Sequence, residues 1–178
     1  MNALPVASVA PVVLSANPAD RLAALFDAHH DRLYRLARRL APNADDALDL
    51  VQETFLKAAR SPTSIPFGLT DEEAWLVRVL INIRRDQWRK TAVRKRYDSQ
   101  MILSATVDND QETVLMARAV VWHALDKLTP RRRAIVVMHE LEGLAIPAIA
   151  SLLGISAITV RWHLSLGRRD LARDLGSP

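Results

Sequence analysis

The chain has 178 residues, of which 49% are hydrophobic, and its formal net charge is +4. This length allows one large domain or two small ones, and the apolar content is enough for real cores. The chain has no cysteine, which excludes disulfides and thiolate metal sites and is typical of a reducing compartment. No apolar stretch approaches a membrane span, and residues 1–18 lack the basic start of a secretory signal. We therefore expect a cytoplasmic protein without membrane insertion, and a flexible tail over residues 1–18.

Two amphipathic helices are predicted next, over residues 20–40 and 43–60, because apolar residues recur there at helical spacing. Asn43 is placed to cap the second helix. The expected buried positions of the first helix are Leu22, Leu25, Phe26, Leu33, Leu36, Ala37 and Leu40, and those of the second are Leu48, Val51, Phe55 and Ala59. The opposite side of the second helix is polar and mostly acidic, with its acids in the first turns, where the helix dipole favours them.

Residues 61–70 contain two prolines, a glycine and small hydroxyl residues, a composition typical of a loop. Thr70 and Glu73 have the spacing of a capping box, which predicts a third helix from about Asp71. Its segment 78–96 is the most basic part of the chain, and Trp75 and Trp88 lie on the same helix. Cations interleaved with aromatic rings suit contact with phosphates and unstacked bases, so we expect this helix to bind nucleic acid.

Residues 98–112 are acidic and lack an apolar period, so they are predicted to form a linker. A fourth helix over 113–128 should bury Ala117, Val121, Ala124, Leu125 and Leu128. The pair Thr129-Pro130 should start a fifth helix that runs to Glu142 and buries Ile135, Met138 and Leu141. No strand-like alternation is present, so the predicted fold is all-α: two helical domains, 19–97 and 113–178, joined by a flexible linker.

The segment 145–173 has the pattern of a helix-turn-helix, the unit that places a second helix in the DNA major groove. Gly154 can end the first helix in a left-handed conformation, Ser156 can cap the second, and Val160 fills the angle between them. Arg131–Arg133, at the start of the preceding helix, are either phosphate contacts or a solvated helix start. The helical period places Val160, Leu164, Gly167 and Leu171 inward and turns these residues toward a groove: Ala157, Ile158, Arg161, Trp162, Ser165, Arg168 and Arg169.

No catalytic, cofactor or metal site is predicted from the remaining polar residues. Asp45, Asp46 and Asp49 form a DDxxD motif that can hold magnesium on a diphosphate, as in prenyl-transfer enzymes, but the second acidic cluster that such enzymes need is absent. The adjacent His29 and His30 point about 100° apart on a helix and do not converge on a metal.

Four strings in order resemble the extracytoplasmic-function sigma factors of the sigma-70 family. They are LVQETFLKAAR, AWLVRVLINIRRDQWRK, LTPRRRAIVVMHELEGL, and IASLLGIS followed by TVR. The resemblance covers about residues 22–175. It implies a promoter-specificity subunit that binds core RNA polymerase, has no catalytic activity of its own, and reads promoter DNA at two elements. An anti-sigma partner is typical of that family.

The resemblance also implies roles for individual residues. Residues 61–73 match the loop that holds a flipped base of the −10 element. The helix that docks on the β′ clamp helices of the polymerase is matched by Asp45, Asp49, Gln52, Glu53, Phe55 and Leu56. The helix that contacts the melted −10 strand is matched by Asn82, Arg84, Arg85, Trp88 and Arg89. The helix-turn-helix would read the −35 element as duplex.

Some positions depart from the family pattern. Ala145 stands where a capping Ser or Thr is usual, and Trp162 stands where a small residue is usual. His163 and Leu166 replace common cations, so the −35 sequence cannot be carried over from relatives. Two alternatives stay open: a stand-alone helix-turn-helix regulator, which would bind duplex DNA without polymerase, and a magnesium-dependent prenyl-transfer enzyme using residues 45–49.

Overall fold

The computed structural model describes residues 17–97 and 112–176. The predicted tail, apart from Asn17 and Pro18, and the predicted linker, apart from Glu112, lie outside the described residues. All regular structure in the described part is helical, which confirms the predicted all-α class. The helices are α1 (Pro18–Leu40), α2 (Ala44–Arg60), α3 (Leu69–Tyr97), α4 (Glu112–Lys127), α5 (Pro130–Val136), α6 (Ile146–Leu153) and α7 (Ala157–Leu175), with a short 3-10 turn, Pro62–Ser64, and a π-helical turn, Val137–Leu141.

The local start and stop signals explain most helix boundaries. The Asn43 side chain accepts a hydrogen bond of 2.8 Å from the Asp46 amide, and the Ser156 hydroxyl accepts one of 3.1 Å from the Thr159 amide. Gly154 has φ of 63°, the left-handed conformation that ends α6. The predicted capping box is wrong. Helix α3 begins at Leu69, and the carboxylate of Glu73 accepts a 2.9 Å hydrogen bond from Arg32 Nε.

The predicted burial of α1 and α2 is partly wrong, and the error lies on one face. Phe26 and Leu48 are 43% and 40% exposed, and Ala59 is also exposed. The α1–α2 contact is made instead by residues rotated about one position along α2, including Ala47, Leu50, Thr54 and Ala58, together with the predicted Val51 and Phe55. These two helices therefore leave an apolar face uncovered.

A π-helical turn alters the end of the α5 segment. The Glu142 amide bonds the Val137 carbonyl, five residues earlier, at 3.1 Å, so the turn holds one residue more than an α-helical turn. As a result Leu141, predicted to be buried, is 54% exposed, whereas the Glu142 side chain is only 7% exposed. Met138 and Ile135 are buried as predicted.

In helix α4, Ala124, Leu125 and the following Leu128 are buried as predicted, but Val121 is 44% exposed. Ala117 was also predicted to be buried, but its side chain lies outside the described part of the structure.

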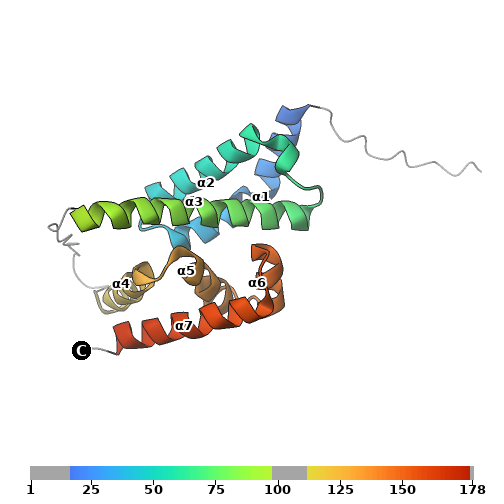
Figure 1. The fold of residues 1–178 in the computed structure, drawn as a ribbon. Coiled ribbons are helices and arrows are strands. Elements are labelled where there is room, and N and C mark those ends of the chain that lie inside the picture. The colour runs from blue at the N-terminus through green and yellow to red at the C-terminus, as the bar shows by residue number, and fades with distance from the viewer. Residues whose placement is uncertain (1–16, 98–111, 177–178) are drawn as a thin grey trace, which may run out of the picture.

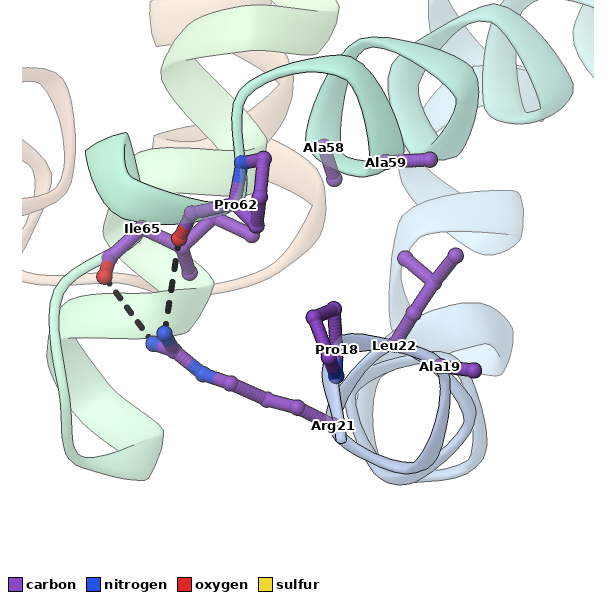
Figure 2. A pocket seen from close by; sticks show the side chains of 8 residues that line it. All are labelled: Pro18, Ala19, Arg21, Leu22, Ala58, Ala59, Pro62 and Ile65. Atoms are coloured by element: carbon purple, nitrogen blue, oxygen red, sulfur yellow. Dashed lines mark hydrogen bonds between the residues drawn. The ribbon is translucent and has the colours of Figure 1, made fainter. Parts of the chain in front are cut away.

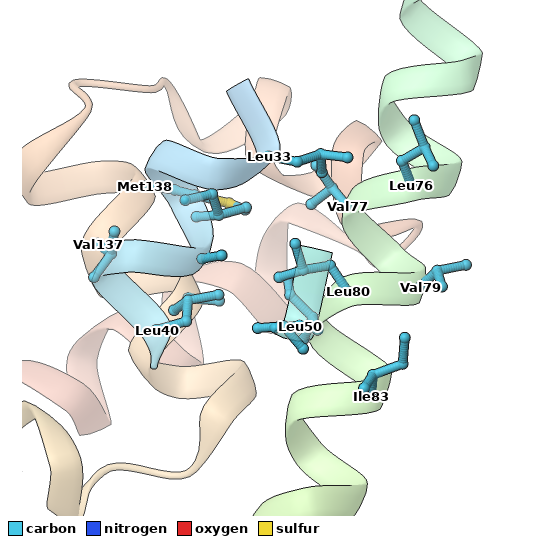
Figure 3. Close-up of a cluster of buried hydrophobic side chains, with 14 of the residues drawn as sticks. Leu33, Leu40, Leu50, Leu76, Val77, Val79, Leu80, Ile83, Val137 and Met138 are labelled. Atoms are coloured by element: carbon cyan, nitrogen blue, oxygen red, sulfur yellow. The ribbon is translucent and has the colours of Figure 1, made fainter. Parts of the chain in front are cut away.

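The two predicted domains pack together around one core in the described structure (Figure 1). Helix α3 lies between α1 and α2 on one side and the C-terminal helices on the other, and it contacts α5 and α6. Figure 3 shows Val137 and Met138 beside Leu33 and Leu40 of α1, with Leu80 of α3 pointing toward the same cluster. We call this arrangement the closed form.

Helix α7 approaches α5 closely at Gly167. A Cβ atom there would lie 2.5 Å from Val136 Cγ2 and 3.2 Å from Arg132 Cγ. Alanine is otherwise favoured over glycine inside a helix by about 1 kcal/mol. Here we expect the reverse: Gly167→Ala should lower the free energy of unfolding by about 1–3 kcal/mol because of overpacking. Thermal or urea unfolding measures the change, and Ser165→Ala, at an exposed position on the same helix, is the control. An unchanged or raised stability would contradict the close packing.

Within residues 17–97 and 112–176, no single helix is long and apolar enough to cross a membrane. The bent pair α6–α7 passes that test jointly, by length and composition alone, with 107° between its two helices.

Candidate functional site

An apolar groove of about 530 Å³ runs between α1 and α2. Its walls come from Leu22, Ala23 and Phe26 of α1 and from Phe55 and Leu56 of α2, and Ala19, Gln52 and Ala59 complete the lining. The Phe26 and Phe55 rings meet with centroids 4.9 Å apart. Leu56 is 54% exposed, so the groove presents a large hydrophobic side chain to solvent.

The acidic residues predicted for polymerase docking lie along α2, on one side of this groove. Asp45, Asp49 and Glu53 are exposed and follow one another at helical spacing, and Glu53 neighbours Gln52 and Leu56 of the groove. Phe55 differs from the rest of the predicted set because it is 7% exposed and forms the floor rather than the rim. The surface is therefore an apolar groove beside an acidic ridge.

The loop between α2 and α3 is held by Arg21 of α1, as Figure 2 shows. Its guanidinium donates to the carbonyls of Ile65 and Pro66 at 2.9 Å and to that of Pro62 at 3.4 Å. It also lies 4.0 Å from the centre of the Phe67 ring, which is 62% exposed. One cation thus fixes the loop backbone and supports an exposed aromatic ring at its tip.

The predicted nucleic-acid residues of α3 divide between two faces. Asn82, Arg85 and Arg89 share one face with Arg78 by the helical period. Arg89 is exposed, and Asn82 and Arg85 are half-buried. Arg78 lies against the turn of the helix-turn-helix, since a Cβ at Gly154 would be 3.4 Å from its guanidinium.

Arg84 and Trp88, four residues apart, lie on a different face of α3 by the helical period. Arg84 Nε donates to the Leu40 carbonyl at 3.0 Å. Burial lowers the pKa of Arg84, and the negative charges of Asp126 and Asp46 oppose that effect. In the closed form Arg84 therefore binds the chain itself, and the structure does not bring it together with Asn82.

The recognition helix α7 shows the predicted division into an inner and an outer face. Val160, Leu164 and Gly167 are buried. The predicted outer residues Ile158, Arg161, Trp162, Ser165, Arg168 and Arg169 are exposed, and Ala157 is half-buried. Arg168 also bonds Glu140, at 2.7 Å from its Nη2.

Two of the three arginines before this motif, Arg132 and Arg133, bond other residues of the fold. Arg133 is 3% exposed, pairs with Asp126 and donates from Nε to the Arg39 carbonyl at 2.9 Å. Burial lowers its pKa, against the opposing charge of Asp126. Arg132 pairs with Asp170 of α7. The phosphate interpretation of this cluster is therefore wrong for Arg133.

A charged cluster joins the two halves of the chain. Glu142, at the end of the π-helical turn, accepts from Arg32 at 3.1 Å and from Arg39 at 2.9 Å, both on α1. Arg32 also binds Glu73 of α3. Burial alone would lower the pKa of Arg32, but the bonds to Glu73 and Glu142 and their charges raise it above its usual value. The cluster thus connects α1, α3 and the C-terminal half.

Within the described residues, no group of three or more His, Asp or Glu side chains is arranged to hold a metal ion. The acids of the DDxxD motif, Asp45 among them, lie exposed along α2. His29 is buried and faces Glu72 at 3.5 Å, without a third ligand. The prenyl-transfer alternative therefore gains no support from the geometry.

Comparison with known proteins identifies the family. The sequence model of sigma-70 region 2 matches residues 25–94, and that of sigma-70 region 4 matches residues 118–171. The ECF RNA polymerase sigma factor SigM of Mycobacterium tuberculosis is 31% identical over 85% of this chain and 76% of its own length. The chain belongs to the extracytoplasmic-function sigma factors. SigE of Mycolicibacterium smegmatis is 38% identical over 80% of this chain, but the match spans only 57% of that relative.

Solved sigma factor structures have the same fold. The sigma factor RpoE, in complex with the anti-sigma factor NepR from Bartonella quintana, superimposes with a TM-score of 0.60 at 25% identity. That match covers 89% of this chain and 96% of RpoE. CnrH, in complex with the cytosolic domain of CnrY, has a TM-score of 0.59 at 24% identity and covers 91% of each chain. Sigma factors are initiation factors and not enzymes, as the sequence analysis expected for this chain.

Sequence reasoning missed four residues of this sigma factor that the geometry brings forward: Phe26, Arg21, Phe67 and Glu142. Phe26 was assigned to the core because its spacing fits the apolar stripe of α1. Arg21 and Glu142 act through partners more than 40 residues away, so no local pattern marks them. Phe67, an aromatic residue in a loop rich in proline and small hydroxyl residues, was the local signal available.

Proposed function

We propose that this sigma factor binds core RNA polymerase, directs it to promoters and starts transcription there. The observation that supports this most is the exposed apolar groove of α1 and α2 with its acidic ridge. A polymerase subunit needs such a docking surface, whereas a free-standing DNA regulator would leave the acidic ridge beside the groove without a task. The β′ clamp helices are the proposed partner, with Leu56 and Phe26 as apolar anchors and Asp45, Asp49 and Glu53 as the charged rim.

The test is transcription in vitro with purified core polymerase, after removal of any bound inhibitor. We expect the folded chain to co-purify with core polymerase and to give specific initiation from a cognate promoter. A folded chain that binds duplex DNA as a dimer, but neither associates with core polymerase nor supports initiation, would show the stand-alone regulator instead.

The proposed −10 contact combines the α2–α3 loop with the Asn82, Arg85 and Arg89 face of α3. A single strand needs cations along its backbone and planar groups for its bases. The α3 face supplies the cations, and the exposed Phe67 ring in the loop supplies one such plane. Arg84 lies outside this proposed contact, because its guanidinium donates to the Leu40 carbonyl within the same half of the chain.

Arg21 should control this loop without touching DNA. Arg21→Ala removes three hydrogen bonds to loop carbonyls and the cation beneath Phe67. Because the loop then loses its fixed conformation, we expect the holoenzyme to bind a −10 single-stranded oligonucleotide about tenfold more weakly. This corresponds to a loss of about 1.4 kcal/mol of binding free energy. Arg38→Ala, at an exposed position later on α1, is the control. Equal affinities for the two variants would contradict a role for Arg21.

The closed form is too small to reach both promoter elements. Sites centred at −10 and −35 are about 25 base pairs apart, or about 85 Å of B-DNA at 3.4 Å per step. A compact chain of this length is only about 40 Å across. We therefore propose that the two halves, joined by the 98–112 linker, separate when the sigma factor binds polymerase and promoter. Once open, each half raises the local concentration of the other at its own element.

An anti-sigma factor is a second proposed partner. RpoE and CnrH are both described in complexes, RpoE with the anti-sigma factor NepR and CnrH with the cytosolic domain of CnrY. A partner that preferred the closed form would keep this chain from reaching both elements at once. Since polymerase and promoter are the proposed targets, we place the protein in the cytoplasm.

A further inference from the structure

Two large apolar side chains stand exposed at the start of the recognition helix. Ile158 is 75% exposed and Trp162 is 57% exposed, and they lie one turn apart on the outer face of α7. The Trp162 ring is held edge-on by the His163 ring, with centroids 4.8 Å apart. Two large apolar side chains exposed one turn apart make this part of α7 a candidate contact surface.

The surroundings of the pair identify the occupant as duplex DNA. Arg161 and Arg169 are exposed beside it, and Ser156 caps the helix directly before it. Helices α6 and α7 meet at 107°, within the usual range for a helix-turn-helix. In that motif the first turns of the second helix reach the base edges, while flanking cations bind phosphates.

The chemistry of the two side chains limits what they can read. Isoleucine has no hydrogen-bonding group, and tryptophan has one donor and no acceptor, so neither can make the bidentate contacts that select guanine or adenine. The thymine 5-methyl group is the apolar feature of the major groove. Burial and the charges of Arg132 and Arg131 lower the pKa of His163, which stands in the place of a usual cation.

The spacing sets the distance between the two bases that are read. Four residues of helix advance about 6 Å, which corresponds to about two base-pair steps. We propose that Ile158 and Trp162 read the methyl groups of two thymines, about two base pairs apart, in the −35 element. This inference rests on the proposed function. It assigns a base preference to the outer face of α7, the surface that departs most from the family pattern.

The experiment uses the holoenzyme, formed from the full chain and core polymerase. Selection from promoters randomised at the −35 element should return thymine at two positions about two base pairs apart. Each selected thymine is then replaced by deoxyuridine, which lacks only the methyl group. We expect each replacement to weaken promoter binding about fourfold, because burial of one methyl-sized group contributes about 0.8 kcal/mol to binding.

Variants assign each methyl group to a side chain. Ile158→Ala should abolish the thymine-over-uracil preference at one position and Trp162→Ala at the other. Leu175→Ala, at an exposed apolar position near the end of the same helix, should keep both preferences. Since Ile158 and Trp162 are exposed, loss of fold is not expected, and circular dichroism checks this.

Two results would overturn the inference while leaving the proposed function intact. One is specific transcription without selected thymines. The other is equal binding of thymine and deoxyuridine promoters by the wild-type holoenzyme. Absence of any initiation, by contrast, would count against the proposed function itself.

Discussion

Leu56→Asp is expected to weaken association with core polymerase about 100-fold while the chain stays folded. Leu56 is 54% exposed in the free chain and lines the α1–α2 groove, so the substitution leaves the core intact. In the complex, however, the new carboxylate would be buried against an apolar partner without a counter-charge, which costs several kcal/mol. A central anchor of an interface commonly contributes about 2 kcal/mol or more, and 100-fold corresponds to about 2.7 kcal/mol.

The matched control is Val120→Asp, which places the same charge on an equally exposed apolar residue of α4, outside the groove. Affinity for core polymerase is measured with labelled sigma factor, and circular dichroism confirms that both variants fold. If both variants lose affinity equally, or neither does, the groove is not the docking surface.

Asp49→Ala should weaken association with core polymerase much less than Leu56→Asp, because an exposed rim charge contributes about 0–1 kcal/mol.

Local signals in the sequence predicted those parts of the fold that depend on neighbouring residues. The caps at Asn43 and Ser156 and the left-handed Gly154 are set by the backbone within one turn, so residue type and spacing were sufficient. The inner face of α7 was predicted for the same reason, since its period is regular from Val160 to Leu171.

The wrong burial predictions have two physical causes. Periodicity marks an apolar stripe but does not say what covers it, so the exposed Phe26 and Leu48 looked the same as core residues. These two side chains border the face that we assign to polymerase. The burial prediction for Leu141 was wrong because the π-helical turn inserts one extra residue. A pattern based on 3.6 residues per turn assumes a helix without such an insertion.

The same π-helical turn creates the contact that sequence reasoning could least anticipate. By rotating Leu141 outward it brings Glu142 inward to Arg32 and Arg39, more than 100 residues earlier in the chain. The sequence indicated two domains with a linker. It held no sign that they share a core, because that depends on pairing between distant residues.

Glu142→Gln is expected to shift the chain toward an open form, since it removes the charge that joins α1 to the C-terminal half and keeps the side-chain size. Glu142 is 7% exposed, but its partners Arg32 and Arg39 are about one third exposed, so water partly compensates them. We therefore expect the closed form to lose about 1–2 kcal/mol, or about fivefold to thirtyfold in the closed-to-open ratio.

Energy transfer between two dyes measures this shift directly. The chain has no native cysteine, so Lys57→Cys on α2 and Ala172→Cys on α7, both at exposed positions, give two unique labelling sites. Transfer should fall in Glu142→Gln. Glu140→Gln is the matched control, because Glu140 pairs with Arg168 inside the C-terminal half and its loss should leave the transfer unchanged. Unchanged transfer in both variants would mean that the remaining contacts between the halves, the shared apolar core and the Arg133–Arg39 bond, hold the chain closed without the Glu142 charge. Binding of the isolated chain to a promoter that carries both elements gives a second measurement. If energy transfer falls in Glu142→Gln and promoter binding becomes tighter, the closed form restrains DNA binding. The reason is that the variant spends less free energy on opening before both halves can bind.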